Sequence, residues 1–141
     1  MNESHVAQIA ELERICFNDP WSVNSIASEL GNKLSMWLVA LEDDKVIGYV
    51  GSQTVLGETD MMNIATHPDY RGKGIATALI KELIAELTMC GSRSLMLEVR
   101  TSNDTAIRLY QNLGFCEVGR RKNYYRNPKE DALILKKEWS L

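Results

Sequence analysis

Two residues in the C-terminal half of this chain could move a proton. Glu98 lies on the more polar side of an alternating apolar run, residues 94–100, and this alternation predicts a strand. Tyr110 lies at helical spacing in a second run, residues 103–114. A carboxylate can accept a proton, and a phenol, with an ordinary pKa of about 10, can donate one. Each also has an ordinary structural interpretation, as a solvated surface carboxylate and as a core aromatic.

A glycine-bearing loop, Arg71-Gly72-Lys73-Gly74-Ile75-Ala76, follows one predicted strand and precedes a long predicted helix. Such a loop directs several backbone N–H groups, and the positive end of the helix dipole, toward an anion. A phosphate could bind there. The glycines could equally do no more than shape a turn, and the loop alone does not decide between the two interpretations.

Two familiar phosphate-binding motifs can be excluded for this loop. A Walker loop needs Ser or Thr after its Gly-Lys pair, whereas Lys73 is followed by Gly74. A dinucleotide-binding fingerprint needs a third glycine where Thr77 stands, together with an early βαβ unit. Here the loop follows predicted helices and antiparallel strands instead.

The periodicity of the apolar residues predicts the elements that must position these groups. The first helix carries Glu13 within its stripe of apolar residues, at spacings of three and four. Four helices are predicted: from Val6 to Cys16, from a Ser22 cap to Leu30, from the glycine loop to a stop near Gly91, and from an Asn103 cap to Gly114. Strands are predicted over 36–41, 46–53, 60–66, 94–100, 115–119 and 132–136, the last two flanking a polar loop that contains tyrosines.

Composition places few limits on function. The 141 residues, 45% hydrophobic and 25% charged, suit one globular domain spanning 1–141. A net charge of −3 argues against direct nucleic-acid binding. No apolar run approaches the roughly 18 residues of a membrane span, and no signal peptide is expected. Cys16, Cys90 and Cys116 show no metal-ligand or nucleophile spacing, so we expect no bound metal, no acyl-cysteine intermediate and a reducing, cytoplasmic setting.

Several motifs together resemble the GNAT superfamily of N-acetyltransferases. Arg71, Gly74 and Ala76 match its pyrophosphate-binding signature, and further motifs occur in the order and spacing of that family. These are His67-Pro68 upstream of the loop, Asn103 with Ala106 and Leu109-Tyr110, and Leu113-Gly114-Phe115. The element order predicted above is also the GNAT order, and the motifs cover the C-terminal half densely.

The resemblance implies an α/β (α+β) fold: a central, mixed, mostly antiparallel twisted sheet, flanked by helices, with splayed middle strands. It also implies acetyl-CoA as co-substrate. Its pantetheine arm would lie in the splay against the backbone of Ile64, Ala65 and Thr66, as a peptide adds to a strand edge. The remaining cofactor-binding residues implied are Arg71, Gly72, Lys73, Gly74, Ile75, Ala76, Thr77 and Asn103. Asn103 would contact the cofactor as well as cap its helix.

Within the superfamily, the chain resembles the RimI type, which acetylates the N-terminal alanine of ribosomal protein S18. In that type, the segment resembling residues 97–100 carries the glutamate that takes the proton from the amine, which implies Glu98 as base and Tyr110 as acid. The acetyl group would pass directly to the amine within a ternary complex. An α-amine, with a pKa roughly 2.5 units below that of lysine, is easier to deprotonate by about 3 kcal/mol.

The amine side of the site is implied by two segments, residues 17–22 and 120–132, with Trp21, Tyr124 and Tyr125 as candidate substrate-binding residues. Trp21 could instead be a packing anchor, and the tyrosines could be strand-edge aromatics. A protein N-terminus, that of a ribosomal protein, is the expected partner. Two alternatives stay open: acetylation of lysine or a small-molecule amine, and a non-enzymatic CoA-binding sensor.

Overall fold

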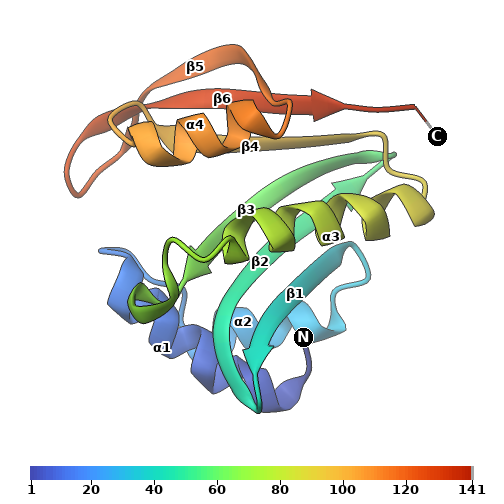
Figure 1. Cartoon of the computed structure of the whole chain (residues 1–141), viewed down its shortest axis with the longest axis vertical. Helices are drawn as coiled ribbons and strands as arrows, with labels where there is room; N and C mark the ends of the chain where they lie inside the picture. The colour runs from blue at the N-terminus through green and yellow to red at the C-terminus, as the bar shows by residue number, and fades with distance from the viewer. Residues whose placement is uncertain (141) are drawn as a thin grey trace.

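The computed structural model describes residues 1–140, which form one six-stranded sheet with helices on both faces (Figure 1). Within that range no helix is long and apolar enough to cross a membrane. The α-helices are α1 (Val6–Cys16), α2 (Val23–Ser28), α3 (Ile75–Met89) and α4 (Asp104–Asn112), with short 3-10 turns at Glu3–His5, Glu29–Gly31 and Pro68–Tyr70. The strands are β1 (Ser35–Glu42), β2 (Lys45–Val55), β3 (Glu58–Thr66), β4 (Ser94–Arg100), β5 (Cys116–Tyr125) and β6 (Glu130–Glu138).

The strands lie in the order β1-β2-β3-β4-β6-β5, and all neighbours are antiparallel except β3 and β4. This one parallel pair is short. Its register runs only from Glu58 opposite Ser94 to Asp60 opposite Met96. Beyond Asp60 the two strands separate, so the second half of β3 pairs with β2 alone. This is the splayed, mixed sheet expected from the sequence, and the predicted fold class is confirmed.

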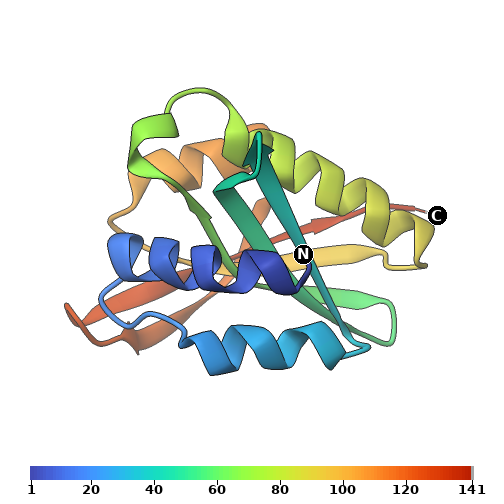
Figure 2. The same cartoon turned by 90° about the horizontal axis from the view of Figure 1, so that it is seen from below.

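Helices α1 and α2 cover one face of the sheet, and α3 and α4 cover the other (Figure 2). The first face holds a core built on Ile9, Ile26 and Tyr49, all fully buried. The opposite face holds a larger core that includes Leu83, Leu95 and Tyr110. Leu95, Leu97 and Val99 of β4 are buried while Met96, Glu98 and Arg100 are partly exposed, so the predicted alternation of β4 is confirmed.

Most predicted elements are confirmed. Helix α1 and strand β4 have the predicted bounds, and the Ser22 hydroxyl caps α2 by accepting from the Ser25 N–H. The predicted second helix ends its α-helical part at Ser28 and continues as a 3-10 turn to Gly31.

The prediction of a polar loop between the last two strands was wrong, because β5 continues to Tyr125. This strand lies at the edge of the sheet and is mostly exposed, so its sequence lacks an alternating apolar pattern. Its pairing with β6 is also irregular between Arg121 and Tyr125, where Asn123 has a φ of 53°. Tyr124 and Tyr125 are therefore strand residues.

Candidate functional site

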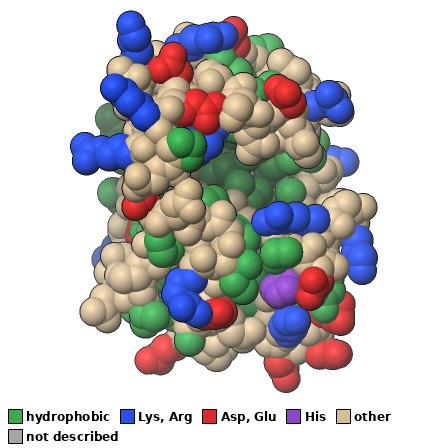
Figure 3. Space-filling view, turned by 90° about the vertical axis from the view of Figure 1, so that its left-hand side faces the viewer, with side chains coloured by type: hydrophobic (Ala, Val, Ile, Leu, Met, Phe, Trp, Pro, Cys, Tyr) green, Lys and Arg blue, Asp and Glu red, His purple; other side chains and the backbone are tan. Residues whose placement is uncertain are grey.

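The separation of β3 from β4 leaves one edge of β3 without a partner strand. His67 N donates to Ile47 O at 2.8 Å, and Ala65 lies opposite Tyr49. Because main-chain groups alternate in direction along a strand, those of Ala65 then face β2, while those of Ile64 and Thr66 face the gap. Figure 3 shows the molecule hollowed on this side, with hydrophobic side chains inside the hollow and charged ones around it.

The glycine loop lies at the start of α3. Gly72 and Gly74 have φ values of 78° and 79°, in the left-handed region that L side chains rarely adopt. The first-turn N–H groups of Ile75, Ala76 and Thr77 have no acceptor within the helix, as in any α-helix. Because no side chain caps α3 at Gly74, they have no side-chain cap either. With the helix dipole behind them, these groups form a site suited to a phosphate.

Arg71 connects the loop to α1. Its Nη2 lies 3.6 Å from the Cys16 sulfur at the last residue of α1, and Cys16 in turn lies 3.8 Å from the Thr66 carbonyl oxygen at the end of β3. The loop, the end of α1 and the end of β3 therefore meet on one side of the gap. The Lys73 ammonium lies over the Tyr70 ring, 5.2 Å from its centre.

Glu98 lies on the α1/α2 side of β4, because its neighbours Leu97 and Val99 face the core under α3 and α4. Its side chain is 21% exposed and forms an ion pair with Arg121, with 3.2 Å between Nε and Oε1. Burial, with smaller contributions from the nearby Tyr124 and Glu98, raises the pKa of Tyr125 to about 12, and the Arg100 charge partly opposes this rise. The carboxylate thus lies beside the two predicted substrate-side tyrosines.

Tyr110 lies on the opposite side of the sheet. It is 5% exposed, packs edge-on against Phe115 with 5.6 Å between ring centres, and belongs to the core under α3 and α4. Burial raises the pKa of Tyr110 well above its ordinary value, with a smaller contribution from Tyr125. The hydroxyl therefore stays protonated at neutral pH. Glu98 and Tyr110 thus lie on opposite faces of the sheet.

Asn103 caps α4, as predicted. Its Oδ1 accepts a hydrogen bond from the Ala106 N–H at 3.2 Å, and the residue is exposed. An amide that caps with its oxygen keeps its N–H donors for another ligand. Its two predicted roles are therefore compatible in this geometry.

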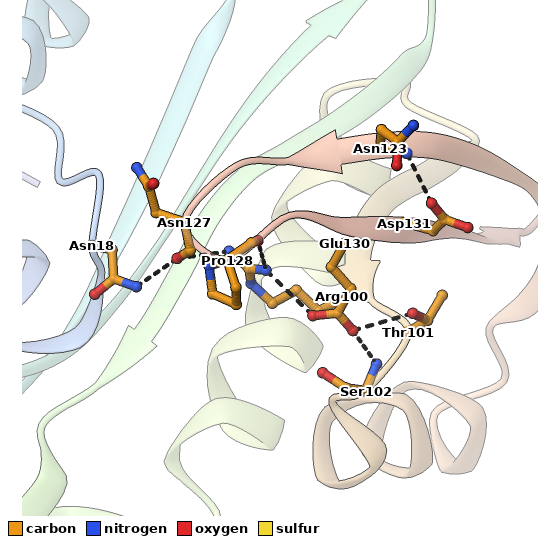
Figure 4. A network of polar contacts seen from close by, with 9 residues as sticks. All are labelled: Asn18, Arg100, Thr101, Ser102, Asn123, Asn127, Pro128, Glu130 and Asp131. Carbon is orange, nitrogen blue, oxygen red and sulfur yellow. Dashed lines mark hydrogen bonds and ion pairs between the residues drawn. The ribbon is translucent and has the colours of Figure 1, made fainter.

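The two predicted amine-side segments touch each other although they are far apart in the chain. Asn18 donates from Nδ2 to the Asn127 carbonyl oxygen at 2.6 Å, and the Asn127 amide lies 3.3 Å from an Asp19 carboxylate oxygen. In Figure 4 the turn between β5 and β6 also receives Arg100, which donates to the Pro128 carbonyl oxygen at 2.8 Å. The segment before α2 and the β5–β6 turn thus form one wall of the hollow.

The aromatic candidates are arranged differently from one another. Trp21 is half-buried and packs edge-on against Trp37 with 5.4 Å between ring centres, so it does serve as a packing anchor. Tyr124 is exposed and packs edge-on against the half-buried Tyr125. The Arg100 guanidinium lies 4.3 Å from the centre of the Tyr125 ring. Of the three aromatics, Tyr124 is the most accessible to a ligand.

The sequence interpretation assigned no role to two acidic residues near this site, Glu130 within the predicted segment 120–132 and Glu13 within the first helix. Glu130 of β6 accepts from Arg100, Thr101 and the Ser102 N–H, and the Ser102 contact is the main reason that its pKa is lowered to about 2. Glu13 is 1% exposed inside the core under α1. The signal for Glu13 was present in the sequence, because it is a carboxylate at an apolar position of the α1 stripe.

The three cysteines differ in exposure. Cys16 is half-buried, Cys90 and Cys116 are exposed, and all three are free thiols. Within residues 1–140, no three His, Cys, Asp or Glu side chains are grouped so that they could hold a metal ion.

Comparison with known proteins places this geometry in context. A family model described as the acetyltransferase (GNAT) family matches residues 6–115. The chain is 41% identical over 118 residues to the ribosomal protein bS18-alanine N-acetyltransferase of Escherichia coli K12, covering 82% of this chain and 79% of that protein. The crystal structure of the ribosomal-protein-S18-alanine N-acetyltransferase from Escherichia coli matches with a TM-score of 0.91 and 34% identity, over 100% of this chain and 92% of the other. The NatC complex bound to Gag peptide and CoA matches with a TM-score of 0.84 and 25% identity, over 99% and 93%.

Proposed function

The chain belongs to the acetyltransferase (GNAT) family, and on this premise we propose that it transfers acetyl from acetyl-CoA to the N-terminal alanine of ribosomal protein S18. The observation that carries the proposal is the open gap between β3 and β4, with Glu98 on one side of the sheet and Tyr110 on the other. The choice of S18 rests on the 41% identity to the Escherichia coli enzyme. Residues 1–141 would act as one domain.

Acetyl-CoA, the co-substrate of this family, fits the groups around the gap. The left-handed glycines and the free first-turn N–H groups of α3 suit its pyrophosphate. The edge of β3 that has no partner strand suits the amides of its pantetheine arm, through the Ile64 carbonyl and the main-chain groups of Thr66, since the Ile64 N–H already donates to Asn63. The Asn103 amide, at the start of α4, would add a polar contact.

The proposed reaction is a direct transfer. The amine nitrogen attacks the thioester carbonyl carbon, the carbon–sulfur bond breaks, and the sulfur leaves as a thiolate. Glu98, directly or through a water molecule, takes the proton that the amine loses. Tyr110 gives a proton to the thiolate, whose basicity matches a thiol pKa of about 8.5. Tyr110 is protonated when the thiolate forms, although burial, by raising its pKa, makes it a weaker acid than a free phenol.

The amine would enter from the α1/α2 side, past the wall formed by Asn18 and Asn127. Tyr124 and Tyr125 would contact the first residues of the peptide, and Trp21 would support this wall from behind. A short peptide with a free α-amine suits this wall. Lysine and small-molecule amines remain the competing substrates.

In the test of this proposal, purified protein and acetyl-CoA are incubated with each of two peptides. One copies the alanine N-terminus of S18, and the other is blocked at its N-terminus but contains lysine. Thiol release gives the rate and product mass locates the acetyl group. Turnover of the free α-amine alone is expected. Turnover of the lysine peptide alone would show that lysine, not the α-amine, is the substrate. If acetyl-CoA binds but neither peptide nor any small amine is acetylated, the CoA-binding sensor is favoured.

A further inference from the structure

A buried carboxylate joins three segments of the chain beneath the amine side of the gap. Glu13 Oε1 accepts a hydrogen bond from the Trp21 main-chain N–H at 2.9 Å. Glu13 Oε2 accepts from Asn63 Nδ2 at 2.7 Å and from the Tyr49 hydroxyl. Helix α1, the segment before α2, and strands β2 and β3 therefore meet at one side chain.

The β3 end of this network lies at the point where β3 has left β4. Asn63 lies opposite Gly51, next to an irregularity in the β2–β3 register. Its amide orientation is fixed from both sides, because Nδ2 donates to Glu13 and Oδ1 accepts from the Ile64 N–H at 3.1 Å. Ile64 is one of the two residues whose main-chain groups face the gap. Glu13 is thus two hydrogen bonds away from the strand edge that faces the acyl donor.

The other end of the network is on the amine side. The Trp21 N–H belongs to the segment that contacts the β5–β6 turn through Asn18 and Asp19. The Trp21 ring packs on Trp37, which in turn stacks on Tyr49 at 5.8 Å between ring centres. Glu13 therefore holds the segment before α2 at Trp21, and the same segment contacts Asn127 through Asn18.

An apolar residue would suit this position of α1 better if packing alone mattered. Burying a carboxylate costs several kcal/mol before its partners compensate. A carboxylate can accept on both oxygens, whereas an amide has a single accepting oxygen. A glutamine at position 13 could accept the hydrogen bond from the Trp21 N–H or the one from Asn63 Nδ2, but not both. The Asn63 amide cannot flip to offer its oxygen instead, because that oxygen already accepts from the Ile64 N–H. The network therefore specifies a carboxylate.

We infer that Glu13 is a positioning residue for the acetyl transfer: it holds the segment before α2 at a fixed place relative to β3, and so sets the position of the amine against the acyl donor. This inference rests on the proposed function for the identity of the amine. Glu13 itself is buried and contacts neither substrate.

The test compares Glu13→Gln with Glu29→Gln. Glu29 is a second buried glutamate, held by Ser35 and Asn32 and not by β3, so it is a matched control. Hydrogen exchange of the free protein is measured at the Trp21 and Ile64 amides, and calorimetry gives the acetyl-CoA Kd. Steady-state rates give kcat and KM for whichever amine the wild-type chain acetylates, so failure of the alanine peptide in the wild type is recognised separately.

Glu13→Gln is expected to speed exchange at Trp21 or Ile64 at least tenfold and to raise the amine KM about tenfold, with the acetyl-CoA Kd within twofold of wild type. Glu29→Gln should leave all of these within twofold. If Glu13→Gln does not fold, Tyr49→Phe, which removes one donor to the carboxylate, should raise the same KM at least threefold. A folded variant with unchanged exchange and KM, or one that loses acetyl-CoA binding in proportion, would overturn the inference.

Discussion

Asn18 and Asn127, 109 residues apart in the chain, are joined by a 2.6 Å hydrogen bond from the Asn18 amide to the Asn127 carbonyl oxygen. This contact connects the segment before α2 with the β5–β6 turn. The two segments together form the wall past which the amine is proposed to enter. Their contact therefore holds the two parts of that wall together.

Loss of this contact should impair use of the peptide more than stability. The bond is exposed, so Asn18→Ala should cost on the order of 1 kcal/mol or less in unfolding free energy. The peptide KM should rise about two- to fivefold while the acetyl-CoA Kd stays unchanged. Asn112→Ala, at the exposed end of α4, is the control. An unchanged peptide KM in Asn18→Ala would show that the wall does not help to bind the peptide.

Glu98→Gln should remove the proton acceptor and leave the fold intact. A positioned base contributes about 100-fold or more, so kcat should fall by at least that factor with acetyl-CoA binding retained. Glu117→Gln is a matched control, because Glu117 forms an ion pair of the same 3.2 Å length with Arg120 on the exposed strand β5. Equal activities of the two variants would remove Glu98 from the mechanism.

Tyr110→Phe should lower kcat about 100-fold, because the thiolate would lose its proton donor. The ring still fills its place against Phe115, so the unfolding temperature should change little. Burial raises the pKa of Tyr110, so the wild-type rate should show no loss from Tyr110 ionisation at ordinary alkaline pH. Rates of the wild type and the variant from pH 7 to 9.5 check both statements. A variant as fast as the wild type would leave Tyr110 with its core-packing role alone.

Gly74→Ala should strain the backbone at the start of α3. The φ of 79° disfavours any L side chain, and a Cβ there would meet no atom within 4 Å, so the cost is conformational and about 1 kcal/mol. Relief of that strain would move the first-turn N–H groups, so the acetyl-CoA Kd should rise at least fivefold. Gly31→Ala is the control, because its Cβ also meets nothing and its φ is not positive. Calorimetric titration with acetyl-CoA measures the difference.

Local patterns in the sequence were sufficient for the elements that bury one face. The stripe of α1, the alternation of β4 and the Asn103 cap were all predicted, because each depends on neighbours within a few residues. The extent of β5 was not, since an exposed edge strand needs no apolar alternation. The Asn18–Asn127 contact joins residues 109 positions apart, and Glu13 contacts Tyr49 and Asn63 at separations of 36 and 50. The place of Glu13 in the α1 stripe was visible in the sequence, but no local periodicity indicates these partners.

Glu13 should make the stability of the protein fall as the pH rises toward neutrality. Burial raises its pKa from 4.5 to about 7, partly offset by the Trp21 N–H, so between these values the folded protein binds a proton that the unfolded chain releases. Stability decreases with pH wherever the folded state holds more protons. Glu13→Gln does not titrate, so the unfolding free energy of the wild type relative to this variant should be smaller at pH 8 than at pH 5. Urea unfolding of both proteins at the two pH values measures this difference. A difference that is independent of pH would mean that Glu13 is already ionised at pH 5, because its three donors then stabilise the carboxylate enough to offset burial.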